Sequence, residues 1–319
     1  MYAVWLPLLV PLLAVPVARR GAELLPPRTA AWALTALALV LAGSSTAALV
    51  LLALDGALRL PFVAALGHFS PHLLGDGSPA TVPAAVLAAL ALAGLGVLVP
   101  WRARRHLREL RAAHRQCGHK PGAGDLWVRP DTRPDAYALP GRPGRPGRIV
   151  VTTGMLRALS AREREVLFAH ERAHLVGRHH LFLAGGELAV ALHPALRGLR
   201  APLSYALERW ADESAARATG DRALTARAVG RAALAAGAAG PAPRPRLSLT
   251  ATAGPVPRRV TALLNRSAPV GRVLPRALAC LLLACVTLSA AAALEAATDL
   301  HNGIETAQGE TGHLSPHGG

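Results

Sequence analysis

Residues 160–180 read SAREREVLFAHERAHLVGRHH, and this stretch contains both a helix-start signal and an H-E-x-x-H sequence. Ser160 and Glu163 form an S-x-x-E capping box, in which each side chain satisfies a backbone N–H group of the other residue at a helix start. The pattern predicts a helix that opens at Ser160 and runs to about Val176. An H-E-x-x-H sequence falls inside that helix, so the spacing of its residues determines which side chains share a helical face.

This H-E-x-x-H sequence consists of His170, Glu171 and His174, with two residues between the last pair. Histidines four residues apart lie one turn apart on one helical face, so both imidazoles can reach one metal ion. Glu171 lies on the flank of that face, where it can take a proton from a water on the metal without being a ligand. Zinc lowers the pKa of its bound water to ~7. The motif therefore predicts a hydrolytic zinc site with Glu171 as general base.

A third ligand is needed, and one candidate is local. The stretch from His170 to His180 fits the longer pattern H-E-x-x-H-x-x-G-x-x-H, with Gly177 in place, which is the metzincin pattern. His180 would then be the third ligand. Metzincins also need a methionine turn downstream, and the only methionines, Met1 and Met155, both precede the motif. The missing turn weighs against His180.

The other candidate lies in ERWADE, residues 208–213. Pro202 suits the first turn of a helix and Gly220 suits the position just past its end, so a helix is expected between them. Glu208 on this helix would complete a His/His/Glu zinc site with one open position. Asp212 lies one turn later on the same face, where it could accept a hydrogen bond from a ligand histidine and fix its ring.

The composition points to a membrane protein. Of the 319 residues, 52% are apolar and only 17% are charged, which excludes a disordered chain and argues against a wholly soluble one. A spanning helix needs ~20 apolar residues. Four stretches predict transmembrane helices, at about 1–18, 29–54, 80–101 and 275–297. Prolines interrupt the first of them, which is also the shortest.

The charge distribution orients these helices. The formal net charge is +16, and Lys120 is the only lysine. Arginines gather in segments 19–28 and 102–115, which the positive-inside rule places in the cytoplasm. Segment 55–79 and the tail 298–319 lack that excess, so they are expected outside. We therefore expect a multi-pass plasma-membrane protein with both termini external, whose partners include the lipid bilayer and no nucleic acid.

The spans and the motif together divide the chain. Residues 1–101 are expected to carry three transmembrane helices, 102–272 a cytoplasmic domain, 275–297 the fourth span and 298–319 a short external tail. Short strands are expected at 126–129, 137–139 and 148–152. The expected fold class is a mainly α integral membrane protein with a cytoplasmic α+β zincin-like metallopeptidase domain between spans three and four.

Other polar residues receive plainer interpretations. His179 is expected to be solvated, and His193, next to a proline, to serve in the core or as a cap. His68 and His72 share a metal-like spacing, but Pro71 between them argues against a regular helix. The basic stretch Arg102–Arg115 adjoins a span, so contact with anionic lipid headgroups is expected there.

Together, HERAHLVGRHH (170–180) and ERWADESAA (208–216) resemble membrane metallopeptidases of the gluzincin type. The resemblance is closest to peptidase family M56, which includes the sensor-transducers of β-lactam resistance. The chain is also similar to peptidase family M48, the HtpX-like and CAAX-prenyl-protease family. AYALPGRPGRPGRIVVTTGML (136–156) is similar to the strand-turn-strand that precedes the H-E-x-x-H helix in these families. The resemblance covers about residues 120–235 and the four-span layout.

Carried over by position, the resemblance implies one zinc ion per chain, held by His170, His174 and Glu208. It implies Glu171 as the catalytic base and Asp212 as a residue behind the ligands. An extended protein or peptide substrate would pair with the strand edge at residues 137–139. The β-lactam sensors carry an external penicillin-binding domain after the last span, and no such domain is expected in the tail of this sequence.

The leading functional hypothesis is a membrane zinc endopeptidase that cleaves a protein substrate at the cytoplasmic face. One alternative is a regulatory signal transducer that cleaves a transcriptional repressor or itself. Another is a non-catalytic membrane scaffold that keeps a structural zinc site. The intact Glu171 argues against the scaffold, because a structural site has no need of a base.

Overall fold

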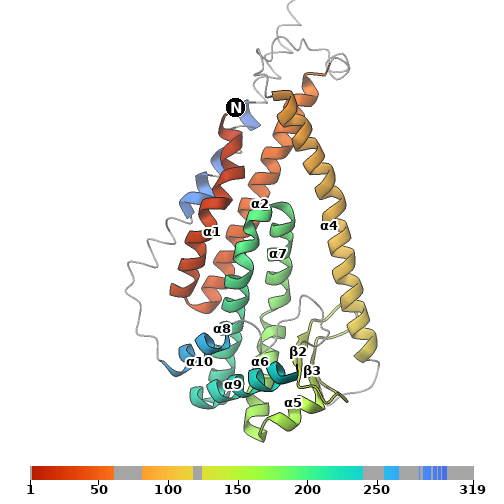
Figure 1. The fold of residues 1–319 in the computed structure, drawn as a ribbon, viewed down its shortest axis with the longest axis vertical. Helices are drawn as coiled ribbons and strands as arrows, with labels where there is room; N and C mark the ends of the chain where they lie inside the picture. The colour runs from red at the N-terminus through yellow and green to blue at the C-terminus, as the bar shows by residue number, and fades with distance from the viewer. Residues whose placement is uncertain are drawn as a thin grey trace, which may run out of the picture.

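The structure, a computed structural model, describes residues 2–60, 81–117, 124–239 and 255–265, together with parts of 280–299. Figure 1 shows long helices that run up the molecule, with the small sheet and the shorter helices gathered at the lower end. In chain order the elements are η1 (Tyr2–Trp5), α1 (Leu6–Leu24), α2 (Pro27–Leu58), α4 (Thr81–Cys117), β1 (Leu126–Arg129), β2 (Ala136–Leu139), β3 (Arg148–Thr152), α5 (Thr153–Ala158), α6 (Ala161–Val176), α7 (His179–Leu192), η3 (Pro194–Leu199), α8 (Arg200–Thr219), α9 (Arg222–Ala239) and α10 (Val256–Leu264).

A single apolar core ties the N-terminal helices to the part of the chain that carries the motif. Helices α7 and α8 rise beside α2, and α1 packs along α2 on the other side (Figure 1). The buried members of this core include Val10, Ala14, Leu34, Leu41, Phe182, Leu203 and Leu207. Segments 1–101 and 102–272 therefore share one interior, and experiments on the metal centre need the full chain.

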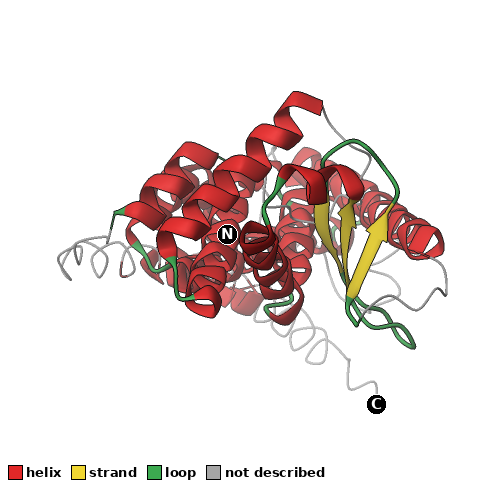
Figure 2. Ribbon diagram, turned by 90° about the horizontal axis from the view of Figure 1, so that it is seen from below, coloured by secondary structure: helices red, strands yellow, loops and turns green. Residues whose placement is uncertain are grey.

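The sheet has three strands in the order β1-β3-β2, and helices lie on both sides of it (Figure 2). Strand β1 runs parallel to β3, with Trp127 opposite Val150, and β2 runs antiparallel, with Tyr137 opposite the same residue. All three expected strands are confirmed, and β2 begins one residue earlier than predicted. Because its single strand neighbour within the described chain is β3, β2 lies at an edge of the sheet.

The two helices that matter most for the site begin and end where local signals place them. Glu163 N–H donates to Ser160 Oγ at 3.4 Å, and Ser160 N–H donates to Glu163 Oε2 at 2.9 Å, so the predicted capping box is present. Helix α6 ends at Val176, as predicted. Helix α8 is followed by Gly220 at φ 69°, a left-handed conformation that glycine adopts without strain.

Among the described residues, α2 and α4 are the helices long and apolar enough to cross a bilayer, so the expectation of four spans is not met. The first predicted span, residues 1–18, is wrong because α1 continues through Arg19, Arg20 and Glu23 to Leu24. Its uncharged part, Leu6–Ala18, is about 20 Å long at a rise of 1.5 Å per residue, short of the ~30 Å of hydrocarbon. The fourth predicted span, 275–297, is described only in parts, and those parts are helical.

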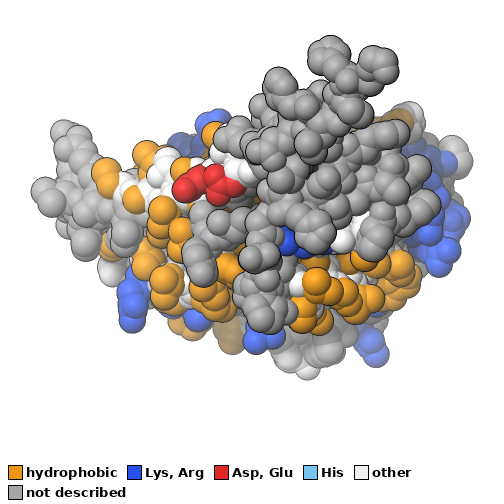
Figure 3. Space-filling model, turned by 90° about the horizontal axis from the view of Figure 1, so that it is seen from above, with side chains coloured by type: hydrophobic (Ala, Val, Ile, Leu, Met, Phe, Trp, Pro, Cys, Tyr) orange, Lys and Arg blue, Asp and Glu red, His pale blue; other side chains and the backbone are white. Residues whose placement is uncertain are grey.

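Helix α4 joins two chemically different halves without a break. Its first half exposes large apolar side chains, among them Leu87 (67%), Leu90 (63%) and Val97 (71%). Its second half, from Arg102 to Cys117, is rich in arginine. Seen from the upper end of Figure 1, the described side chains in view are mostly hydrophobic, with basic side chains toward the periphery (Figure 3). Such apolar exposure needs a non-aqueous environment or a covering partner.

Candidate metal centre

Helices α6 and α8 bring three ligand atoms to one point. His170 Nε2 lies 3.1 Å from His174 Nε2 and 3.4 Å from Glu208 Oε2, and His174 Nε2 lies 3.6 Å from Glu208 Oε1. All three side chains are buried, and their ligand atoms lie within 4.8 Å of one another. Three converging nitrogen and carboxylate donors with one side open are typical of a catalytic zinc site.

Glu208, and not His180, completes this group. Helix α6 ends at Val176, and the chain turns through Gly177 and Arg178 before α7 begins. His180 is only half-buried and lines a groove beside the centre. Within the described chain, the set of side chains able to hold one ion is His170, His174 and Glu208. The metzincin alternative therefore finds no support in the geometry.

This choice of third ligand is testable by metal content. Glu208→Ala should empty the site of the purified full chain, because it removes one of the three converging donors. His180→Ala should leave the zinc content at about one ion per chain, as in the wild type. The measurement is zinc per chain by mass spectrometry after dialysis. A site emptied by His180→Ala but not by Glu208→Ala would restore the metzincin assignment.

Asp212 lies directly behind His170, as its spacing from Glu208 predicts. Its Oδ1 is 3.0 Å from His170 Nδ1, the ring nitrogen that faces away from the ligand group. Burial alone would raise the pKa of Asp212, but Arg259 and His170 lower it to about 2, so the side chain is a carboxylate. The carboxylate can accept a hydrogen bond from His170 Nδ1–H and hold Nε2 toward the metal.

Arg259, from α10, is the residue of this centre that sequence reasoning missed. It is fully buried, and its guanidinium donates to both oxygens of Asp212, at 2.8 and 2.6 Å. Its Nη1 also lies 2.9 Å from Glu208 Oε2. Burial disfavours the cation, but the carboxylates of Glu208 and Asp212 raise the pKa of Arg259 further, so it stays charged. Arg259 thus contacts both Glu208, a candidate metal ligand, and Asp212, which lies behind His170.

His179 contradicts the expectation of a solvated side chain. It is buried, and its Nδ1 lies 2.7 Å from His174 Nδ1. Burial, reinforced by His170, lowers the pKa of His179 to about 3, so the ring is neutral and can accept the hydrogen bond that His174 Nδ1–H donates. A Cβ on Gly177 would lie 2.5 Å from His179 Nε2, so this ring can fold back only over a glycine.

Glu171 occupies the interior of the same centre. Its side chain is fully buried, and it is one of the carboxylates that raise the pKa of Arg259. The remaining histidine in question behaves as expected, since His193 Nε2 lies 3.2 Å from the Leu8 carbonyl oxygen in a core contact. His68 and His72 lie outside the described residues.

The charges of the centre fit a divalent cation. Three buried carboxylates, Glu171, Glu208 and Asp212, face one buried cation, Arg259, so the formal sum is two negative charges. Burial opposes a charged His170, yet Asp212 and Glu208 raise its pKa to about 10, so the centre attracts positive charge. His174 keeps a lone pair, because burial holds its pKa well below the usual value. Zinc bound to a neutral His170 would bring the formal sum of the three carboxylates, Arg259 and the ion to zero.

Comparison with known proteins finds that part of the chain is similar to a known family. Residues 107–194 match the profile of Peptidase family M48, from the basic end of α4 to the start of η3. No significant match to the chain was found among curated proteins or among solved structures. Of the two families that the motifs resemble, M48 is thus the one found, and M56, placed first on sequence, is not. Residues 107–194, which include His170 and His174, are therefore similar to the zinc metallopeptidases of Peptidase family M48, and Glu208 from outside the matched stretch joins the group that could hold the metal ion.

Proposed function

We propose that this protein is a membrane-anchored zinc endopeptidase that cleaves protein or peptide substrates, with Glu171 as general base. The observation that carries the proposal is the buried His170, His174 and Glu208 group with the carboxylate of Glu171 beside it. A site that served folding alone would use four closed ligands and would not need the adjoining base.

In the proposed mechanism, zinc held by His170, His174 and Glu208 would supply a water of lowered pKa and would polarise the scissile carbonyl group. The carboxylate of Glu171 takes a proton from the attacking water and passes it to the leaving amine as the peptide bond breaks. Asp212 and His179 hold the rings of His170 and His174 from behind, at 3.0 and 2.7 Å. Burial of all these groups excludes bulk water and strengthens their interactions with one another.

The substrate backbone is proposed to pair with strand β2, whose one strand neighbour among the described residues is β3. Strand β2 ends at Leu139, and its residue Ala138 lines a small cavity together with His174. An extended peptide beside β2 would therefore run past a metal ligand. Backbone pairing of this kind gives affinity without requiring a particular sequence, which suits a protease.

The membrane part of the proposal rests on α2 and α4. Both are long enough and apolar enough to cross a bilayer. The basic start of α2 and the arginine-rich end of α4 point to the end of the molecule that carries the sheet (Figure 1). Arg28 at the start of α2 also stacks on Trp210 of α8, 5.4 Å from the ring centre. By the positive-inside rule this end is cytoplasmic, and residues 102–272 would supply the catalytic part.

A reporter experiment tests this orientation. A fusion after Arg115 should report the cytoplasm, and one inserted between α2 and α4, in segment 61–80, should report the exterior. The reason is the charge difference between the two ends of the helical pair. The same compartment for both positions would mean that α2 or α4 does not cross the bilayer.

The catalytic part of the proposal is tested in cells through Glu171→Gln. Protein fragments that are present with the wild type and vanish with this variant are candidate products. If those fragments derive mainly from one transcriptional repressor or from the chain itself, the regulatory alternative gains support. If no fragment depends on Glu171, the scaffold alternative replaces the endopeptidase.

A further inference from the structure

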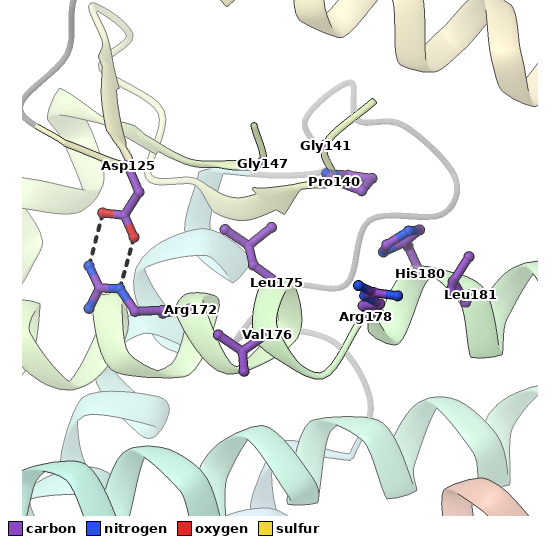
Figure 4. A pocket seen from close by; sticks show the side chains of 10 residues that line it. All are labelled: Asp125, Pro140, Gly141, Gly147, Arg172, Leu175, Val176, Arg178, His180 and Leu181. Atoms are coloured by element: carbon purple, nitrogen blue, oxygen red, sulfur yellow. Dashed lines mark hydrogen bonds and ion pairs between the residues drawn. The ribbon is translucent and has the colours of Figure 1, made fainter. Parts of the chain in front are cut away.

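A groove of about 550 Å³ opens beside the metal centre, between the end of α6, the start of α7 and the loop that joins β2 to β3 (Figure 4). Leu175, Val176 and Leu181 give it apolar side chains. Val176 is 78% exposed and Leu181 is 53% exposed, so both can contact a ligand directly. Arg172 and Arg178 bring positive charge to the same groove.

The groove lies next to the metal centre. A small cavity of about 10 Å³ lies between them, and it is lined by Ala138, Pro140, His174, Leu175, His179 and His180. Three of these residues, Pro140, Leu175 and His180, also line the groove, and His174 is a metal ligand. A peptide whose scissile bond lies at the metal can therefore place a neighbouring side chain in the groove.

The loop wall of the groove is built to lie close to α6. A Cβ on Gly147 would lie 3.1 Å from Leu175 Cδ2, and one on Gly141 would lie 2.8 Å from the backbone nitrogen of Gly147. Both glycines line the groove. The loop between them is closed by the backbone hydrogen bonds of Arg142 with Arg145.

The two basic side chains of the groove differ in how they are used. The Arg172 guanidinium donates to both carboxylate oxygens of Asp125, at 2.8 and 2.9 Å, so this pair is neutral (Figure 4). Arg178 is exposed and makes no ion pair among the described residues. It lies beside His180, whose pKa is lowered by burial and by Arg178, so His180 adds no charge near pH 7. The net charge of the groove is therefore positive and comes from Arg178.

The backbone conformation of Arg178 is a second, independent observation. Its φ is 50°, and it is the one non-glycine residue with a positive φ in the described chain. Asparagine or glycine would adopt this conformation at lower cost. An arginine kept in an unfavourable conformation at the mouth of a groove suggests that its side chain has a role there.

We propose that this groove binds an acidic side chain of the substrate, a Glu or Asp close to the scissile bond, through the guanidinium of Arg178. The apolar side chains of Leu175 and Val176 then contact the methylene groups of that residue or an apolar neighbour. The inference rests on the proposed function and adds a substrate preference to it. An anionic lipid headgroup is the other occupant that the charge would suit, but the groove shares Pro140, Leu175 and His180 with the small cavity that His174 lines, and this proximity to a metal ligand favours a peptide.

The experiment uses the full chain in detergent and a set of quenched fluorescent peptides. Once one cleaved peptide is known, each position beside its scissile bond is varied as Glu, Gln and Lys. At the groove position, the wild type should show a kcat/KM about 10-fold higher for Glu than for Gln, the size of one charge-assisted hydrogen bond. Arg178→Asn, which tolerates the left-handed backbone, should bring this ratio close to one. Arg178→Glu should reverse it in favour of Lys.

Arg162→Glu is the matched control, since Arg162 is exposed at the other end of α6 and lies outside the groove. It should keep the wild-type preference for Glu. An unchanged Glu, Gln and Lys profile in Arg178→Glu would overturn the inference, as would a variant that alters binding to anionic vesicles and leaves peptide preference intact. If no peptide is cut in a Glu171-dependent way, the proposed function fails first, and the two failures are distinguishable.

Discussion

Glu171→Gln is expected to lower kcat on any cleaved peptide by about 10²-fold or more, the scale of a lost general base. The amide keeps the size and the polarity of the side chain but cannot take a proton from the attacking water. Zinc content should stay at the wild-type value, because Glu171 is not one of the three converging ligands. The measurements are steady-state cleavage and zinc per chain on the same preparations.

The cleavage rate and the zinc content of Glu171→Gln are expected to respond differently. A variant that loses zinc together with activity would show that Glu171 is needed to build the metal site. That result is not expected, because the ligands His170 and His174 are held in place by α6 itself. A variant that keeps both zinc and near wild-type turnover would sink the proposed mechanism. A structural metal site would then be the better description of His170, His174 and Glu208.

The part of the centre carried by α6 and α8 could be predicted because its signals are local. The Ser160 and Glu163 capping box sets the start of α6, and Gly220 marks the end of α8. With both helices placed, periodicity alone puts the histidines on one face and Glu208 one turn before Asp212. Side chains on one helical face need only a correct helix, so these predictions did not depend on the rest of the fold.

Arg259 and His179 could not be predicted because their positions depend on tertiary contacts. Residues 258 and 259 are both arginine, and nothing in the sequence distinguishes the one with a 54% exposed side chain from the one that is fully buried. Fully buried arginine is also rare, so the residue type alone predicts that both side chains lie at the surface. His179 is turned inward by the bend at Gly177 and Arg178, which periodicity along α6 does not foresee.

The first apolar stretch shows a different limit. Residues 1–18 are uncharged, and a count of apolar residues therefore suggests a span. The helix that forms, α1, extends beyond them through two arginines and packs against α2 and α8 in the common core. The apolar content of a stretch does not show where the helix begins and ends. Here the helix boundaries, Leu6 and Leu24, leave too short an uncharged part for a span.

Arg259→Met is expected to destabilise the metal-free full chain by about 3–5 kcal/mol, the cost of removing one partner from a buried ion pair. The reason is that Asp212 and Glu208 would keep their negative charges in the interior without the guanidinium that contacts both. Methionine has a similar length and no charge, so the change tests the charge more than the packing. Denaturant unfolding in detergent, with a chelator present, measures the effect.

Arg258→Met is the control for this measurement, because the neighbouring arginine is on the same short helix. Arg258 pairs with Glu23 at 2.6 Å, and both side chains are about half exposed, at 54% and 49%. Exposed ion pairs contribute about 0–1 kcal/mol, so this variant should unfold close to the wild type. Equal effects of the two substitutions would mean that α10 matters only as a packed helix.

Arg259→Lys separates charge from geometry at the same position. Lysine keeps the positive charge but cannot donate in parallel to both oxygens of Asp212 while also contacting Glu208. If Arg259 holds these carboxylates in position, Arg259→Lys should lower zinc affinity by ~10-fold or more, the scale of a lost residue behind a ligand. If Arg259 only neutralises charge, the lysine variant should bind zinc as the wild type does, and Arg259→Met should bind it more tightly, because a divalent cation would then meet three carboxylates with no competing guanidinium. The two accounts differ in the zinc affinity that they predict for Arg259→Lys, so a zinc titration of the wild type and the two variants decides between them.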